Sequence, residues 1–349
     1  MSQAQEVEAQ PVATEYIPPS VSEHLPDLHA GSSYAHYSPL PVNVTPNSLE
    51  SQGTPVVLGV DEAGRGPVIG PMIYGIAYLP IELQHSLLAE THHFDDSKVL
   101  TPLVRAKLMR TLCTSGTNLF ENVGWAIKSL SAQDISAGMM RYGGSYNLNA
   151  QAMDATIEVI RGVIARGVNV QEIFVDTIGQ PAVYQKKLQA IFPTCKVVVE
   201  KKADSLFPVV SAASVVAKVT RDVSCEVLYQ GVKTGKITAK RDAMEVDGVV
   251  EVEDLVIGWG SGYPSDAKCV TWLKGNIDET FGWGNECRFS WGTAKDLLED
   301  KNKAIQIDWA DEDKENNELS QYFGAGMTGI KGEEQELRTW FGSGVKEIF

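Results

Sequence analysis

The sequence predicts an α/β fold in which helices flank a mixed β-sheet. Short apolar runs bounded by turn residues are typical of buried strands, because they are too brief to form core helices. Longer segments between these runs have apolar residues at helical spacing, and this succession of strands and helices indicates an α/β sheet rather than a bundle or sandwich. The predicted strands lie at 56–60, 73–78, 124–127, 172–175 and 197–200.

Three helices are predicted beside these strands. Thr101 followed by Pro102 is an N-cap with proline at the first helical position, so a helix begins there and runs to about Leu112. Apolar residues recur at helical spacing over 148–165, which predicts a second helix with one face in the core. A third helix is predicted over about 207–229, which is small and apolar at first and then polar.

Composition divides the chain into a folded domain and two tails. Residues 1–52 are rich in Pro, Ser, Gln and Glu, and we predict a disordered acidic tail there. The folded domain is predicted over 53–300, with a surface insertion at about 232–257 where the charge changes from basic to acidic. Residues 301–349 hold ten acids against six bases and predict an acidic tail for partner binding.

Bulk properties narrow the class of protein. The chain has 349 residues and is 43% hydrophobic, which is enough for a sizeable core. Five cysteines without a CxxC spacing speak against disulfides and a zinc site, and no signal peptide or membrane span is expected. The net charge of −15 disfavours nucleic-acid binding, but residues 101–241 hold 18 Lys and Arg against 10 acids, which predicts a local basic groove.

The segment 56–66, VVLGVDEAGRG, is the strongest functional signal. Asp61 and Glu62 end a buried strand, where carboxylates are costly unless something such as a divalent metal ion neutralises them. Gly64 and Gly66 let a backbone approach a phosphate or sugar, and Arg65 offers a fork suited to phosphate. The alternative is a strand end and a turn in which an acid caps a helix. The whole string is more restrictive than an acid pair alone, so we prefer a nuclease site.

Two further acids extend this site. Asp176 ends the apolar run at 173–175, and Asp204 follows the run at 197–199. Sites in α/β sheets gather at such strand ends, so these acids are expected to meet Asp61 and Glu62. Four oxygen ligands without cysteine, in a chain with no histidine after His93, suit Mg²⁺ or Mn²⁺. Taken singly, either acid is better explained as a cap or a surface charge, but together with the string DEAGRG at 61–66 we prefer metal ligands.

Five motifs together carry a resemblance to a known family. They are GVDEAGRGPVIGPMIYG from 59, DDSK at 95–98, FVDTIG at 174–179, KADSLFPVVSAASVVAKVTRD at 202–222 and GSGYPSD at 260–266. In this order they resemble the catalytic A subunits of eukaryotic ribonuclease H type 2 over about residues 55–298. The resemblance implies an RNase H-like α/β fold, with a mixed central sheet flanked by helices and a helical C-terminal part.

The resemblance also implies an activity and a setting. Such an endoribonuclease hydrolyses the RNA strand of RNA–DNA hybrids and nicks 5′ of single ribonucleotides embedded in duplex DNA, leaving 3′-hydroxyl and 5′-phosphate ends. Two metal ions, Mg²⁺ or Mn²⁺, are expected in its site. It would act in the nucleus, in ribonucleotide excision repair and in RNA primer removal during DNA replication. It would do so as part of a heterotrimer with two accessory subunits of B and C type.

By the same resemblance, individual residues are expected to take particular roles. The catalytic and metal-binding residues would be Asp61, Glu62, Asp176 and Asp204. Substrate would be bound by Gly64, Arg65 and Gly66, which read the 2′-hydroxyl, by Tyr263, which packs on the nucleotide, and by Lys98 and Arg221, which contact phosphates. Read in isolation, the last three are surface charges and a turn residue. Asn147 and Asn149 are candidate substrate contacts, and helix capping explains Asn147 equally well.

A repeated pattern marks the C-terminal tail. The segments 316–323 and 334–341 have the hydrophobic spacing of sliding-clamp binding peptides, although both lack the usual first glutamine. We prefer an amphipathic tail that packs on a partner subunit.

Two other functions compete with the ribonuclease: a DNA-directed nuclease or transferase, which would not need a 2′-hydroxyl, and a non-catalytic scaffold, which would not need intact acids.

Overall fold

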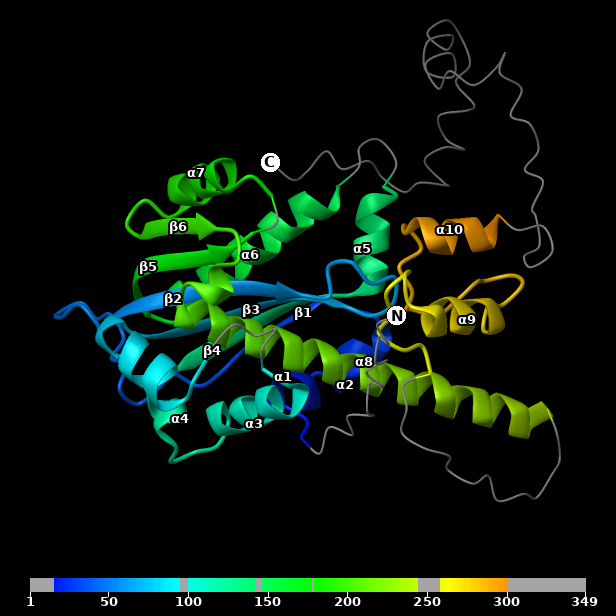
Figure 1. Cartoon of the computed structure of the whole chain (residues 1–349), viewed down its shortest axis with the longest axis horizontal. Coiled ribbons are helices and arrows are strands. Elements are labelled where there is room, and N and C mark those ends of the chain that lie inside the picture. The colour runs from blue at the N-terminus through cyan, green and yellow to red at the C-terminus, as the bar shows by residue number, and fades with distance from the viewer. Residues whose placement is uncertain (1–15, 95–99, 142–145, 178, 244–257, 300–349) are drawn as a thin grey trace, which may run out of the picture. The chain divides into compact units, whose positions relative to one another are not determined.

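The computed structural model describes residues 16–94, 100–141, 146–177, 179–243 and 258–299 (Figure 1). The strands are β1 (Tyr34–Tyr37), β2 (Pro55–Ala63), β3 (Met72–Pro80), β4 (Gly124–Leu130), β5 (Asn169–Asp176) and β6 (Lys196–Glu200). The α-helices are α1 (Pro19–Ser22), α2 (Leu25–Ala30), α3 (Pro102–Leu112), α4 (Asn118–Asn122), α5 (Ala132–Met139), α6 (Leu148–Ala165), α7 (Pro181–Ile191), α8 (Pro208–Ala243), α9 (Ala267–Gly275) and α10 (Gly292–Leu298). Two 3₁₀ turns, η1 (Ile81–Leu83) and η3 (Ala203–Ser205), and one π-helix, η2 (Gln84–Thr91), complete the helical elements of the described residues. Within the described ranges, no helix has the length and apolar character needed to cross a membrane.

The strands form one mixed sheet, which confirms the predicted fold class. Its order is β1-β4-β3-β2-β5-β6, antiparallel from β1 to β2 and parallel from β2 through β5 to β6. The register pairs Val60 with Val175, and Val175 in turn with Val199. The parallel strands therefore end together, and the acidic residues that follow those valines are brought to one edge of the sheet.

Helices cover both faces of the sheet. Figure 1 shows α8 crossing one face, while α6 and α7 lie on the other side. Successive side chains of β2 alternate between these layers, because neighbours on a strand point to opposite faces. Val57 packs in the same core as Ala213 of α8, whereas Val56 and Leu58 pack with Val159 of α6. A strand buried on both faces is apolar at every position, and this explains the continuous run that predicted β2.

Helix α8 lies unusually close to the sheet. A Cβ atom at Gly59 would stand 2.4 Å from the carbonyl oxygen of Val209, and one at Gly75 would stand 2.5 Å from that of Ala213. Only glycine leaves room for this approach. The small residues Ser211 to Ser214 are all fully buried in α8, and their small side chains allow this close packing.

Residues 16–52 overturn the prediction of a disordered tail over 1–52; residues 1–15 lie outside the described part. This segment forms α1, α2 and the edge strand β1, which pairs with β4. Val21 is fully buried, and the Tyr34 hydroxyl donates to the carbonyl of Ser20. The polar composition was misleading because few apolar residues suffice when the chain is held on an existing sheet edge and on α8.

The predicted insertion at 232–257 is also corrected in part. Helix α8 continues to Ala243, so residues 232–243 prolong the helix, and 244–257 lie outside the described residues. Figure 1 shows these last turns extending past the end of the sheet. A helix that leaves the sheet needs no apolar face there, so a polar charged stretch is compatible with helix. The tail at 301–349, with its clamp-like segments, lies outside the described residues as well.

Candidate active site

Acidic side chains gather at the ends of three adjacent strands, as predicted. Asp61 and Glu62 lie near the end of β2, Asp176 is the last residue of β5, and Asp204 lies in η3, which follows β6. Asp61 is only 5% exposed and Asp204 only 4%. Buried carboxyl groups of this kind require compensation, so their burial at one edge of the sheet marks a functional site.

Mutual repulsion shows that these carboxyl groups share one small region. Burial first and the neighbouring Glu62 next raise the pKa of Asp61 well above its usual value. Burial and the charge of Asp176 raise the pKa of Glu62 to about 7. The pKa of Asp176 is also raised, by burial and by Asp204. A cation placed among them would remove both the repulsion and much of the burial cost.

Backbone donors hold the acids in place. The Glu62 N–H donates to Asp61 Oδ1 at 2.7 Å, and the Ala203 N–H donates to Asp176 Oδ1 at 2.9 Å. The turn that aims the Ala203 N–H contains Lys202 in the left-handed region, with φ of 58°. A non-glycine residue in that conformation at an active site is typical of a locally enforced geometry.

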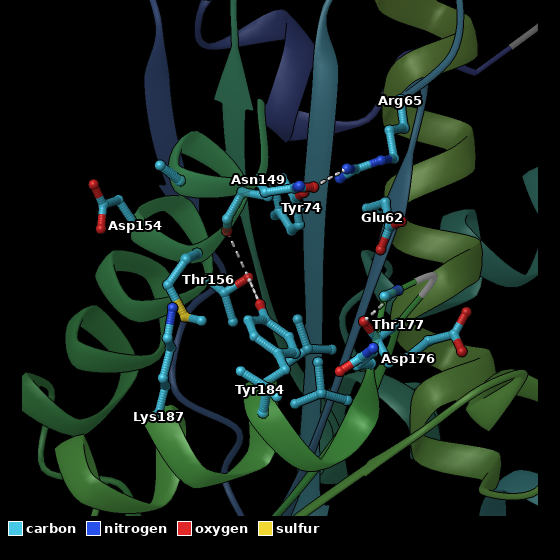
Figure 2. Close-up of a pocket in the computed structure, with 18 of the residues that line it drawn as sticks. Glu62, Arg65, Tyr74, Asn149, Asp154, Thr156, Asp176, Thr177, Tyr184 and Lys187 are labelled. Carbon is cyan, nitrogen blue, oxygen red and sulfur yellow. Dashed lines mark hydrogen bonds between the residues drawn. The ribbon is translucent and has the colours of Figure 1, made fainter. Parts of the chain in front are cut away.

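A cavity of about 530 Å³, lined by both polar and apolar side chains, opens beside Glu62 and Asp176. Figure 2 shows these two acids on one side of the cavity and Asp154 and Lys187 on the opposite side. Arg65 reaches across to donate a hydrogen bond to Asn149 Oδ1. The cavity therefore combines carboxylate, cationic and amide groups with apolar side chains, a lining that offers several polar contacts to a ligand.

The loop Gly64–Gly66 and Tyr263 lie against each other. Gly64 has φ of +80°, which a glycine adopts without strain, and it turns the chain out of β2. A Cβ atom at Gly66 would stand 2.9 Å from Cε1 of Tyr263, so the ring packs directly on the loop. Tyr263 remains 42% exposed. The structure thus brings together two elements that the sequence separates by about two hundred residues.

The other predicted substrate residues differ in where the structure places them. Arg221 lies beneath the loop, where its Nη2 donates to the carbonyl of Ser261 at 3.0 Å, and its side chain is 13% exposed. Phosphate contact by Arg221 stays a prediction. Asn147 is the N-cap of α6, accepting from the Ala150 N–H at 3.0 Å, and it also lines the cavity. Lys98 lies outside the described residues.

Sequence reasoning missed two residues that support the loop. Arg288 and Trp291 precede α10 and donate hydrogen bonds to backbone carbonyls of Gly64, Arg65 and Gly66. Their only signal in the sequence is an arginine within an otherwise apolar and aromatic string, CRFSW, which is unusual for a residue that proves to be fully buried.

A mixed sheet flanked by helices, with carboxylates at the ends of its central parallel strands, defines a nuclease of the ribonuclease H-like class. Residues 58–294 match the ribonuclease HII family, and the chain belongs to that family. It is accordingly an endoribonuclease of the ribonuclease H type, and the resemblance first drawn from its motifs is confirmed.

Individual relatives agree with this assignment. The A subunit of ribonuclease H2 from Neurospora crassa is 51% identical over 94% of this chain and 95% of that protein. The corresponding A subunits from Schizosaccharomyces pombe and Homo sapiens are 45% and 41% identical, over 94% and 77% of this chain and 89% and 82% of theirs. The crystal structure of ribonuclease H2 from Pyrococcus horikoshii OT3 superposes with a TM-score of 0.51 at 27% identity, covering 69% of this chain and 96% of that one.

Proposed function

We propose that this chain is the catalytic subunit of a ribonuclease H2 that hydrolyses the RNA strand of RNA–DNA hybrids and nicks 5′ of single ribonucleotides in duplex DNA. One observation carries the proposal: the acidic cluster lies beside a glycine loop packed on an exposed tyrosine. The cluster supplies the chemistry of phosphodiester hydrolysis. The loop and the ring supply close contact with one sugar, whose 2′-hydroxyl distinguishes RNA from DNA.

The donor set of the site fits Mg²⁺ or Mn²⁺. Asp61, Glu62, Asp176 and Asp204 offer hard oxygen ligands, and their mutual repulsion is relieved by a cation. Among the described residues, no three His, Cys, Asp or Glu side chains form a ready cage for one ion. Mg²⁺ usually keeps several waters and takes substrate phosphate oxygens alongside one or two carboxylates, so it does not depend on a cage built by the protein alone.

Two bound ions would activate a water molecule and stabilise the leaving oxygen of an in-line displacement. The protein's own groups would position the substrate for that displacement. Arg65, held by Asn149, lies at the mouth of the cavity, where its charge suits a phosphate. The Gly64–Gly66 backbone has no side chains at its glycines to bar the approach of a ribose, and the Tyr263 ring can pack on that sugar.

The relatives are named as the A component of ribonuclease H2, which supports a place in a multi-subunit complex, and we propose the two accessory subunits of B and C type as partners. Nuclear location and roles in ribonucleotide excision repair and primer removal follow from the proposed substrate. The acidic tail at 301–349 is the proposed docking segment for one of these partners. Titrating peptide 312–345 against a sliding clamp tests the competing use of that tail.

The decisive experiment compares duplexes that contain one ribonucleotide with all-DNA duplexes, with and without Mg²⁺. We expect cleavage only when both the ribose and the metal are present. Asp204→Asn should abolish cleavage while retaining substrate binding, and the exposed Glu279→Gln should leave cleavage unchanged as a control. Cutting of all-DNA duplex would favour a DNA-directed nuclease, and full activity of Asp204→Asn would remove the assigned site.

A further inference from the structure

Three consecutive backbone carbonyls of the Gly64–Gly66 loop are held by two side chains from a distant segment. Arg288 donates from Nη2 to the carbonyl of Gly64 at 2.6 Å and from Nη1 to that of Arg65 at 3.0 Å. Trp291 donates from Nε1 to the carbonyl of Gly66 at 3.0 Å. A loop in which every carbonyl is anchored in this way has a fixed orientation.

Arg288 is built into this position rather than resting on the surface. It is fully buried, its Nε donates to the carbonyl of Gly70 at 3.0 Å, and its guanidinium lies 4.8 Å from the centre of the Trp291 ring. Burial lowers the pKa of Arg288 to about 9, so the group keeps its charge and all its donors at neutral pH. The planar fork of an arginine presents five donors in fixed directions, whereas a lysine offers a single compact ammonium group that cannot reach the same set of carbonyls with the same geometry.

Anchoring the carbonyls determines where the loop's N–H groups point. In a trans peptide unit the carbonyl and the following N–H point in opposite directions. Since the carbonyls of Gly64 and Arg65 face Arg288, the N–H groups of Arg65 and Gly66 face away from it. Two N–H donors held side by side form a natural binding point for a hydroxyl or a phosphate oxygen.

The same segment also holds Tyr263 against the loop. The Val68 N–H donates to the carbonyl of Gly262 at 2.8 Å, and the Arg288 N–H donates to the carbonyl of Val68 at 2.8 Å. Residues on either side of the loop, the tyrosine turn and Arg288 thus form one hydrogen-bonded unit. The spacing between the loop's N–H groups and the Tyr263 ring is therefore set by Arg288 and its neighbours.

We propose that Arg288, assisted by Trp291, is a positioning residue that aligns the loop with Tyr263 and so determines recognition of a single ribonucleotide. This inference rests on the proposed function. In a duplex with one ribose, only one register of substrate offers a 2′-hydroxyl to the loop. In a continuous hybrid every register does, so loss of alignment costs less there.

The test measures cleavage rates on a single-ribonucleotide duplex and on a continuous hybrid for Arg288→Lys and Trp291→Phe. The measured quantity is the cleavage rate on the single-ribonucleotide duplex divided by the rate on the continuous hybrid. We expect this ratio to fall by about tenfold for Arg288→Lys and by a smaller factor for Trp291→Phe. Trp283→Phe is the matched control, because it also removes an indole bond to a backbone carbonyl, that of Leu273 at 3.0 Å, away from the loop. Its ratio should stay at the wild-type value.

A ratio unchanged in both variants, or one that shifts equally in Trp283→Phe, overturns the proposal. Melting temperatures measured in parallel separate loss of alignment from loss of folding. If Arg288→Lys fails to fold, Trp291→Phe decides the question alone, because it keeps an aromatic ring and removes the N–H. If the wild-type protein cleaves duplexes that contain no ribonucleotide, the proposed function itself is refuted. That result is distinct from an unchanged rate ratio in the variants.

Discussion

Asp61 illustrates the conflict between function and stability at a single residue. Burial and Glu62 raise its folded-state pKa, so the folded protein binds a proton more tightly than the unfolded chain does. Stability due to this group is therefore gained as pH falls through the raised pKa, and above that pKa the ionised carboxylate opposes folding. Under the proposed function, Asp61 serves cleavage at a cost to the stability of the fold.

We expect Asp61→Asn to abolish cleavage and to stabilise the metal-free protein at pH 8 by about 1 to 2 kcal/mol. The amide keeps an oxygen that can accept from the Glu62 N–H and removes the charge, while its NH₂ replaces the second carboxylate oxygen. Urea unfolding in the presence of a chelator measures this at pH 8 and at pH 5. The advantage should shrink at pH 5, and a less stable variant at pH 8 would contradict the argument.

Lys202 tests the backbone geometry beside Asp176. Its φ of 58° is unfavourable for side chains with a Cβ and most unfavourable for β-branched ones. Lys202→Gly should be neutral or stabilising, and Lys202→Val should destabilise by about 1 to 2 kcal/mol in denaturant unfolding. Lys201→Val, at the exposed neighbouring position, is the control and should change stability little.

At this scale the sequence predicted the positions of the acids better than the positions of the residues that support the site. Asp61 and Asp176 could be predicted because each follows directly from a strand that is recognisable by its apolar run. Arg288 could not, because its role depends on contacts with carbonyls 223 and 224 positions away. No local pattern encodes which backbone groups a buried arginine will meet. Tyr263 was found only through family resemblance.

At the scale of elements, the close packing of α8 on the sheet predicts that glycines beneath it cannot be replaced without loss of stability. Gly59→Ala and Gly75→Ala place a methyl group within 2.4 and 2.5 Å of backbone oxygens of α8, which cannot move aside as a flexible side chain would. We expect each to destabilise by about 3 kcal/mol or more, measured by thermal or denaturant unfolding. Gly275→Ala, with open space around it, should change stability little, and equal effects would refute the close packing.

Elements that are marked by their own sequence, through caps or regular apolar spacing, were predicted well. Elements that depend on contacts with distant segments were not. Helix α3 begins where Thr101 caps it, and α6 has the predicted bounds because Asn147 caps it and its apolar spacing is regular. Strand β1 was missed because its four residues carry no run long enough to detect and gain their hydrogen bonds from β4. The length of α8 was underestimated because its polar end has no core to face.

At the scale of the whole molecule, the segment 16–37 belongs to the folded body. Val21→Ala should lower the free energy of unfolding by about 1 to 3 kcal/mol, because the residue is fully buried in the core shared with α8. Val42→Ala, at a position 75% exposed, should change it by less than about 0.5 kcal/mol. If the two variants unfold alike, the N-terminal segment does not contribute to the core as the structure shows.

The buried hydrogen bond between Ser20 and Thr220 spans 200 positions of sequence. During synthesis, the beginning of the chain must therefore wait for its partner helix to leave the ribosome, about 10 to 40 seconds at ordinary translation rates. Helix α1 is synthesised well before α8 and can pack against it only after α8 has been made. A nascent chain that stalls before α8 emerges would leave Val21 and the rest of the apolar side of α1 uncovered.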